Sequence, residues 1–90
     1  MDLRRLPGGE LIAAGLDDLV HGRETAAALL VQVGAPRLTR LGLNVPAAPP
    51  RVEHRLYALL ASTDPATAHS RYNALIRRLV SFERAAECAR

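Results

Sequence analysis

The sequence is poor in the residues that mark secreted and membrane proteins. Its 90 residues include one cysteine, three aromatic residues, no tryptophan and no lysine. The single cysteine, Cys88, cannot form an internal disulfide, so nothing favours an oxidising compartment. The longest apolar run, residues 26–31, is too short to cross a bilayer, and the first residues lack the continuous apolar segment of a signal peptide. We therefore expect a cytoplasmic protein that does not bind a membrane.

The apolar residues that are present favour helices. They make up 49% of the chain, and most of them are alanine, leucine and valine. Alanine and leucine are among the strongest helix formers, whereas the aromatic and β-branched residues typical of strands are scarce. A chain of this length has room for one domain with a modest core. The composition predicts an all-α protein, with residues 1–90 forming a single helical domain.

The charge is positive but small. Twelve basic residues against nine acidic residues give a net charge of +3, and every basic residue is arginine. Two explanations stay open. A GC-rich gene encodes many arginines whatever the function, and arginine is also the preferred cation at phosphates and protein interfaces. The excess is modest compared with the clustered basic faces of dedicated nucleic-acid-binding proteins.

Residues 1–43 contain the signals of three short helices. The first is expected from residue 9 or 10 to residue 20 or 21, with Leu19 and Val20 facing inward and Asp17 and Asp18 on a solvated face. The second is expected from residue 23 or 24 to residue 33. Because residues 26–31 are apolar on all sides, this helix should lie in the middle of the domain.

A glycine and a proline separate the second helix from the third. Gly34 is expected in a left-handed conformation at the end of the second helix, and Pro36 in the first turn of a third helix over residues 36–41. Residues 44–50 then form a proline-rich connector.

Residues 51–90 read as a helical hairpin. One helix is expected over residues 51–61, and another over 65–86, with Asp64 as its N-cap and Pro65 as its first residue. The short loop between them makes these helices antiparallel neighbours. The whole chain is thus predicted to be a compact bundle of four to five helices.

A helical wheel of the last helix places its apolar side chains on one face. This predicted core face comprises Ala68, Tyr72, Leu75, Ile76, Leu79, Phe82 and Ala86. The arginines are split, because Arg71 and Arg78 lie along one edge of this face and Arg77 and Arg84 lie toward the other side. Glu83 lies at the margin of the core face, where we expect it to pair with an arginine.

Small residues lie between the two pairs of arginines, where another helix can approach closely. The predicted interaction surface comprises Ser70, Ala74, Arg77, Ser81 and Arg84. We predict that this surface binds another protein, first of all a second copy of the chain in a homodimer. The competing interpretation is an ordinary solvated helix face.

Nucleic-acid binding, as an accessory or regulatory protein, is the alternative function. Its predicted contacts are Arg37, Arg40, Arg71 and Arg78. Residues 25–43 have some features of a helix-turn-helix, but the second helix would be very short, and Leu30 stands where the two helices should press together. A core helix followed by a linking turn is the favoured interpretation of this segment.

No arrangement of residues indicates catalysis or a cofactor. His21, His54 and His69 lie on separate elements without the spacing of a metal site. Cys88 follows Glu87, whose negative charge does not activate a thiol. Glu10 and Glu24 suit the first turns of helices. We predict neither an enzyme nor a bound metal or cofactor.

Overall fold

A computed structural model describes residues 2–89 of the chain, and these residues contain helices and no strands. The helices are η1 (Leu3–Arg5), α1 (Gly9–Val20), α2 (Ala26–Val33), α3 (Ala35–Arg40), α4 (Val52–Thr63) and α5 (Ala68–Ala89). The prediction of an all-α bundle is confirmed. Its helices pack into a body of 38 × 24 × 18 Å, so α5, at about 1.5 Å per residue, spans most of the long dimension.

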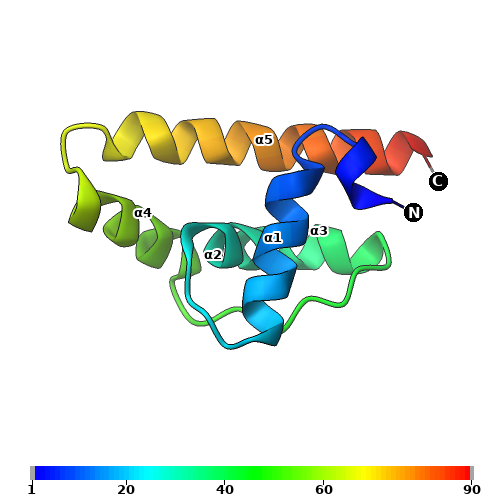
Figure 1. Cartoon of the computed structure of the whole chain (residues 1–90), viewed down its shortest axis with the longest axis horizontal. Coiled ribbons are helices and arrows are strands. Elements are labelled where there is room, and N and C mark those ends of the chain that lie inside the picture. Colours follow the sequence, from blue (N-terminus) through cyan, green and yellow to red (C-terminus); the bar gives the residue numbers. More distant parts are fainter. Residues whose placement is uncertain (1, 90) are drawn as a thin grey trace.

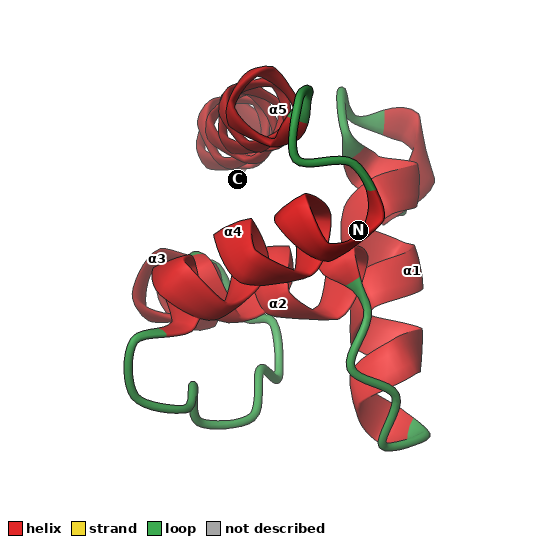
Figure 2. Ribbon diagram, turned by 90° about the vertical axis from the view of Figure 1, so that its left-hand side faces the viewer, coloured by secondary structure: helices red, strands yellow, loops and turns green. Residues whose placement is uncertain are grey.

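The helices pack in an open bundle around α2. Figure 1 shows α4, α2 and α3 in a row beneath α5, with α1 crossing in front of α2. The chain leaves α4 through a short turn and runs back along α5 in the opposite direction (Figure 1). The view in Figure 2 shows α5 and α1 on different sides of the row formed by α2, α3 and α4.

The crossing of α1 over α2 depends on a glycine. Gly15 is buried, and a Cβ atom there would lie 2.4 Å from the backbone oxygen of Ala27 and 2.6 Å from a methyl group of Val31. These separations are shorter than van der Waals contact, so only glycine allows the two helices to approach this closely.

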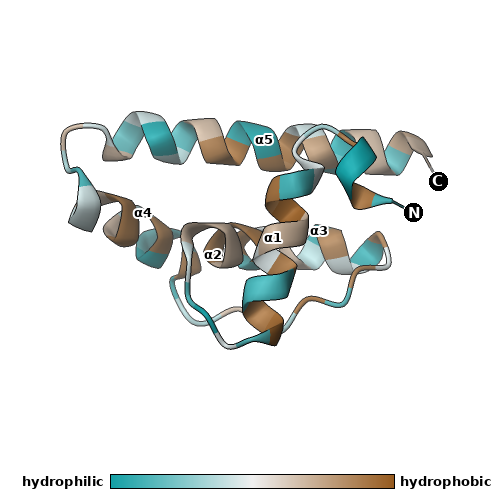
Figure 3. Ribbon diagram, in the orientation of Figure 1, coloured by the Kyte–Doolittle hydropathy of each residue, from teal (hydrophilic) through white to brown (hydrophobic). Residues whose placement is uncertain are grey.

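The hydrophobic core is centred on α2, as its sequence predicted. Ala28, Leu29, Leu30 and Val31 are at most 1% exposed. The other buried apolar residues come from α1, α3, α4 and α5 and from the residue that follows α3: Ile12, Leu38, Leu41, Val52, Leu56, Leu60, Ala68, Leu79, Phe82 and Ala86. Figure 3 shows the resulting pattern on α5, where hydrophobic and hydrophilic segments alternate along the ribbon.

The beginning of α2 differs from the prediction. The helix starts at Ala26 because Thr25 adopts an extended conformation and its hydroxyl oxygen accepts the backbone N–H of Ala28. Glu24 therefore lies outside the helix, where its carboxylate pairs with Arg55 of α4. Asp18 is also not a solvated residue, since its side chain is 16% exposed and accepts hydrogen bonds from Thr25 and Arg23.

The junction between α2 and α3 was also predicted incorrectly in one respect. Gly34 has φ −87° and is not left-handed. A Cβ atom there would lie 2.9 Å from a methyl group of Leu79 and 3.2 Å from a carboxylate oxygen of Glu83. The absence of a side chain at Gly34 thus lets α5 approach the end of α2. Leu38 and Leu41 face inward, as predicted.

The turn between α4 and α5 is longer than predicted. Helix α4 continues to Thr63, and α5 begins at Ala68 rather than Pro65. Asp64 does not cap α5 at its first residue; its side chain accepts the backbone N–H of Ala66 within the turn. Across the hairpin, the rings of Tyr57 and Tyr72 lie 5.7 Å apart.

Among residues 2–89, no helix is long and apolar enough to cross a membrane.

Candidate functional site

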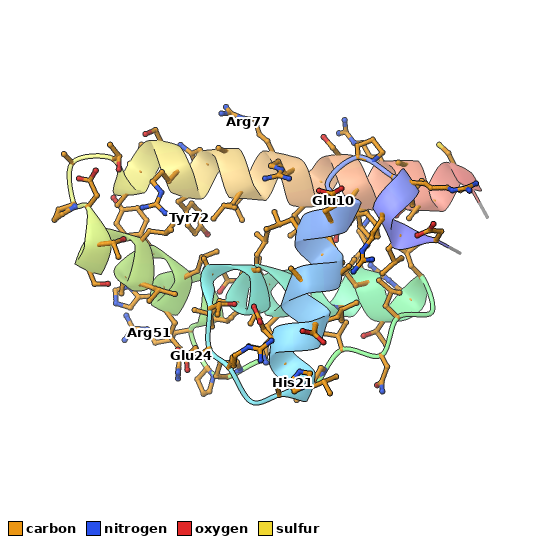
Figure 4. All side chains as sticks on the ribbon, in the orientation of Figure 1. Glu10, His21, Glu24, Arg51, Tyr72 and Arg77 are labelled. Carbon is orange, nitrogen blue, oxygen red and sulfur yellow. The ribbon has the colours of Figure 1, made fainter. Side chains whose placement is uncertain are left out.

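The outer face of α5 contains all five residues of the predicted interaction surface. Ser70, Ala74, Arg77, Ser81 and Arg84 are each exposed. The opposite face of the same helix is buried, with Phe82 fully inaccessible and Leu79 4% exposed. Figure 4 shows Arg77 extending away from the rest of the molecule. We call these five residues the α5 outer face.

Neighbouring elements cover the other sides of α5. On one side, the backbone oxygen of Arg78 lies close to Gly8, just before α1. On another side, α3 and the end of α2 contact Leu79 and Glu83. A groove lies between α3 and α5, and its lining includes the apolar residues Val33, Ile76 and Val80. The α5 outer face lies between these two covered sides, and no helix within residues 2–89 packs on it.

Two carboxylates of α5 hold Arg37 of α3. Its Nη1 lies 3.5 Å from Oε1 of Glu83, and its Nε donates a hydrogen bond to Glu87. Glu83 is 5% exposed and is the only buried charged residue among those described. The predicted ion pair between Glu83 and an arginine is thus present.

The two carboxylates respond differently to the same arginine. Burial raises the pKa of Glu83, although the positive charge of Arg37 opposes this shift and that of Glu87 adds to it. The hydrogen bond from Arg37 lowers the pKa of Glu87. Burial is therefore the dominant influence on the carboxylate of Glu83, and the arginine is dominant for Glu87.

The four arginines predicted as nucleic-acid contacts lie on two sides of α5. Arg37 and Arg40 belong to α3, and both line the groove between α3 and α5. Arg71 and Arg78 lie along the other edge of α5, where Arg71 donates a hydrogen bond of 3.4 Å to the Thr63 hydroxyl. A helix that follows one phosphate strand usually presents its cations together, whereas these four arginines are divided between two sides of α5.

A second exposed helix face lies on α1 and was not among the predicted surfaces. Val20 was expected to face inward, yet it is 81% exposed. A shallow groove runs along α1 beside this side chain. Its lining residues are Arg4, Glu10, Ala13, Ala14, Leu16, Asp17 and Val20.

The spacing of charged residues in the sequence could have predicted this face. Glu10 and Asp17 are seven residues apart, with Ala13 and Ala14 between them, so they share one side of the helix. We call Glu10, Ala13, Ala14, Asp17 and Val20 the α1 outer face.

The remaining polar clusters have structural roles. Arg23 pairs with Asp17 and Asp18 at 3.0 and 2.9 Å and thereby ties the loop after α1 to that helix. His21 ends α1, and its Nδ1 lies 2.8 Å from the backbone oxygen of Asp17. His69 lies beside Asn73 on α5, with 3.2 Å between their side-chain nitrogens.

No protein-family model matches the chain, and no match was found among curated proteins or solved structures.

Proposed function

We propose that this chain is a protein-interaction module of the cytoplasm that binds through the α5 outer face, first of all to a second copy of itself. The observation that carries the proposal is the position of Ser70, Ala74, Arg77, Ser81 and Arg84, all exposed on the longest helix of the chain. The proposed function contains no catalytic step.

The chemistry of this surface supports binding to a helix. Ala74 and Ser81 are small, so a second helix can approach the backbone of α5 closely along this line. Arg77 and Arg84 extend beside them and can pair with carboxylates of a partner while their aliphatic stems cover the joint. The contact would cost the chain little rearrangement, because the opposite face of α5 is already fixed by the core.

The experiment is a measurement of molar mass by light scattering over a wide range of protein concentrations. The test variant is Ala74→Glu with Ser81→Glu, which places two carboxylates in the middle of the surface. Ala58→Glu with Ser62→Glu is the matched control, since both positions are exposed on α4. We expect the wild-type chain and the control to associate, and the test variant to remain monomeric with an unchanged circular dichroism spectrum.

Two outcomes contradict the proposal. If the test variant associates like the wild-type chain, the α5 outer face is not the binding surface. If the wild-type chain is monomeric at every concentration, self-association is wrong. Titration with duplex DNA and RNA at several salt concentrations would then test the alternative function, which requires an affinity that falls steeply with salt.

A further inference from the structure

We infer that the α5 outer face binds the α1 outer face of a second copy of this chain, so that the self-association is head-to-tail. This inference rests on the proposed function and specifies the partner surface. It predicts contacts between Glu10 or Asp17 of one copy and Arg77 or Arg84 of the next.

The α1 outer face has the features of a surface that another helix covers. Val20 is the most exposed large apolar side chain described, at 81%. Ala13 and Ala14 leave the backbone of α1 accessible, and the groove beside them gives a second helix a place to lie. Covering this face with a second helix would remove the Val20 side chain from water, which adds a favourable apolar contribution to the contact.

The two faces have the same spacing and opposite charge. On α1, Glu10 and Asp17 are seven residues apart, and on α5 Arg77 and Arg84 are also seven residues apart. Seven residues make about two turns, so each pair projects from the same side of its helix at a separation of about 10 Å. Two helices placed side by side can therefore form both charge pairs at once.

The residues between the charges also correspond. Ala13 and Ala14 occupy the positions between the two acids, and Val80 and Ser81 occupy the same positions between the two arginines. These small or medium side chains would fill the joint between the helices without a clash.

The acidic residues are accessible for these contacts. Glu10 is exposed and forms no ion pair within residues 2–89. Asp17 pairs with Arg23, but its side chain is 62% exposed, and a carboxylate can accept several donors. Figure 4 shows Arg77 extending away from the molecule and Glu10 on α1. Within residues 2–89, neither acid forms an ion pair with Arg77 or Arg84. The proposed contact is therefore one between copies.

A contact between two different faces has consequences for the assembly. A bound pair still offers a free α1 face on one copy and a free α5 face on the other, so the association continues beyond a pair until a ring closes. A single pair of helices of this length buries an area below about 1,200 Å², which is typical of weak complexes. Because exposed charges dominate the contact, salt should weaken it.

Charge reversal on each face provides the test. One variant carries Arg77→Glu with Arg84→Glu, and the other carries Glu10→Arg with Asp17→Arg. Glu53→Arg with Asp64→Arg is the control for the second variant, because it changes the net charge equally at exposed positions of α4 and the following turn. Circular dichroism and thermal unfolding of every variant verify that the fold is retained.

Each reversed variant alone should associate at least about tenfold more weakly than the wild-type chain, because like charges then face each other between copies. An equimolar mixture of the two variants should recover association, since each reversed face meets a face of opposite charge on the other chain. Light scattering gives the mass, and chromatography of the mixture gives its composition, which we expect to be one to one.

The other outcomes overturn the inference in distinguishable ways. If only the α5 variant loses association, the α5 outer face is the binding surface but α1 is not its partner, so the proposed function stands. If both variants lose association and their mixture does not recover it, the two faces do not bind each other. If the wild-type chain associates and neither variant differs from it, the chain associates through other surfaces, and both this inference and the α5 outer face as the binding surface are wrong. If the wild-type chain is monomeric, this inference and the proposed self-association are both wrong.

Discussion

Nη1 of Arg37 and Oε1 of Glu83 lie 3.5 Å apart, although the two residues are separated by 46 positions in the sequence. This contact joins α3 to the second half of α5. It also places a carboxylate at a site that is 5% exposed, where Gly34 leaves just enough space beside it. The cost of burying this charge is offset by the guanidinium of Arg37 only in part, because Glu87 shares the same arginine.

The first prediction concerns the pH dependence of stability. Since the pKa of Glu83 is raised in the folded chain, the folded state holds this proton more tightly than the unfolded state does. The corresponding contribution to stability is present below the ordinary glutamate pKa and is lost as pH rises through the raised value. Glu83→Gln should therefore gain stability relative to the wild-type chain as pH increases from acidic to neutral, as measured by urea unfolding at each pH.

Glu87→Gln is the matched comparison for this prediction. Its stability relative to the wild-type chain should fall as pH increases, which is opposite to the trend expected for Glu83→Gln. The pKa of Glu87 is lowered by Arg37, so its stabilising contribution is present above the ordinary pKa and is lost as pH falls through the lowered value. The variant should thus be less stable than the wild-type chain at neutral pH, with a difference that shrinks in acid. Identical pH profiles for the two variants would contradict the assignment of separate causes to the two shifts.

The second prediction concerns the crossing of α1 and α2. Gly15→Ala should reduce the free energy of unfolding by about 1–3 kcal/mol, because the new methyl group meets the backbone oxygen of Ala27, which cannot move independently. Gly34→Ala should be tolerated better, since its nearest neighbours are the ends of the Leu79 and Glu83 side chains. Chemical denaturation of both variants gives the comparison, and a larger loss for Gly34→Ala would show that the α1–α2 crossing is not the tighter contact.

The third prediction concerns the N-terminal end of α2. Thr25→Ala removes the side-chain oxygen that accepts the N–H of Ala28 and the hydroxyl that donates to Asp18. We expect a loss of about 0.5–2 kcal/mol in the free energy of unfolding. Thr25→Ser retains both hydrogen bonds and is the control, so it should remain close to the wild-type chain in the same thermal unfolding measurement.

The fourth prediction concerns the only phenylalanine. Phe82 is fully inaccessible and lies on α5 close to Gly8, before α1. Phe82→Ala should cost about 3–5 kcal/mol through lost contacts and the cavity left behind, which is enough to unfold a marginal domain of this size. Phe82→Leu should retain the fold at a smaller cost, and near-equal stability of the two variants would mean that the site collapses around the smaller side chain.

Local sequence signals located most of the helices. The apolar residues of α2 predicted both the helix and its central position, because a helix that is apolar on every side has no stable place at the surface. The exposed positions of α5 followed from its helical spacing in the same way. The errors occurred at helix ends, where local hydrogen bonds moved the boundaries. The Thr25 hydroxyl accepts the N–H of Ala28 and α2 starts later than predicted, and the Asp64 carboxylate accepts the N–H of Ala66 within the turn.

The helical composition, the central position of α2 and the split of the arginines on α5 follow from the sequence alone, because they depend on helix propensity and on a period of 3.6 residues. Three features required the packing of the helices: the pairing of Arg37 with Glu83 and Glu87, the close approach of α5 to Gly34, and the exposure of Val20. These features depend on which helices approach one another and how closely. That choice is made by the packing of all the apolar faces together, and no single segment of the sequence contains it.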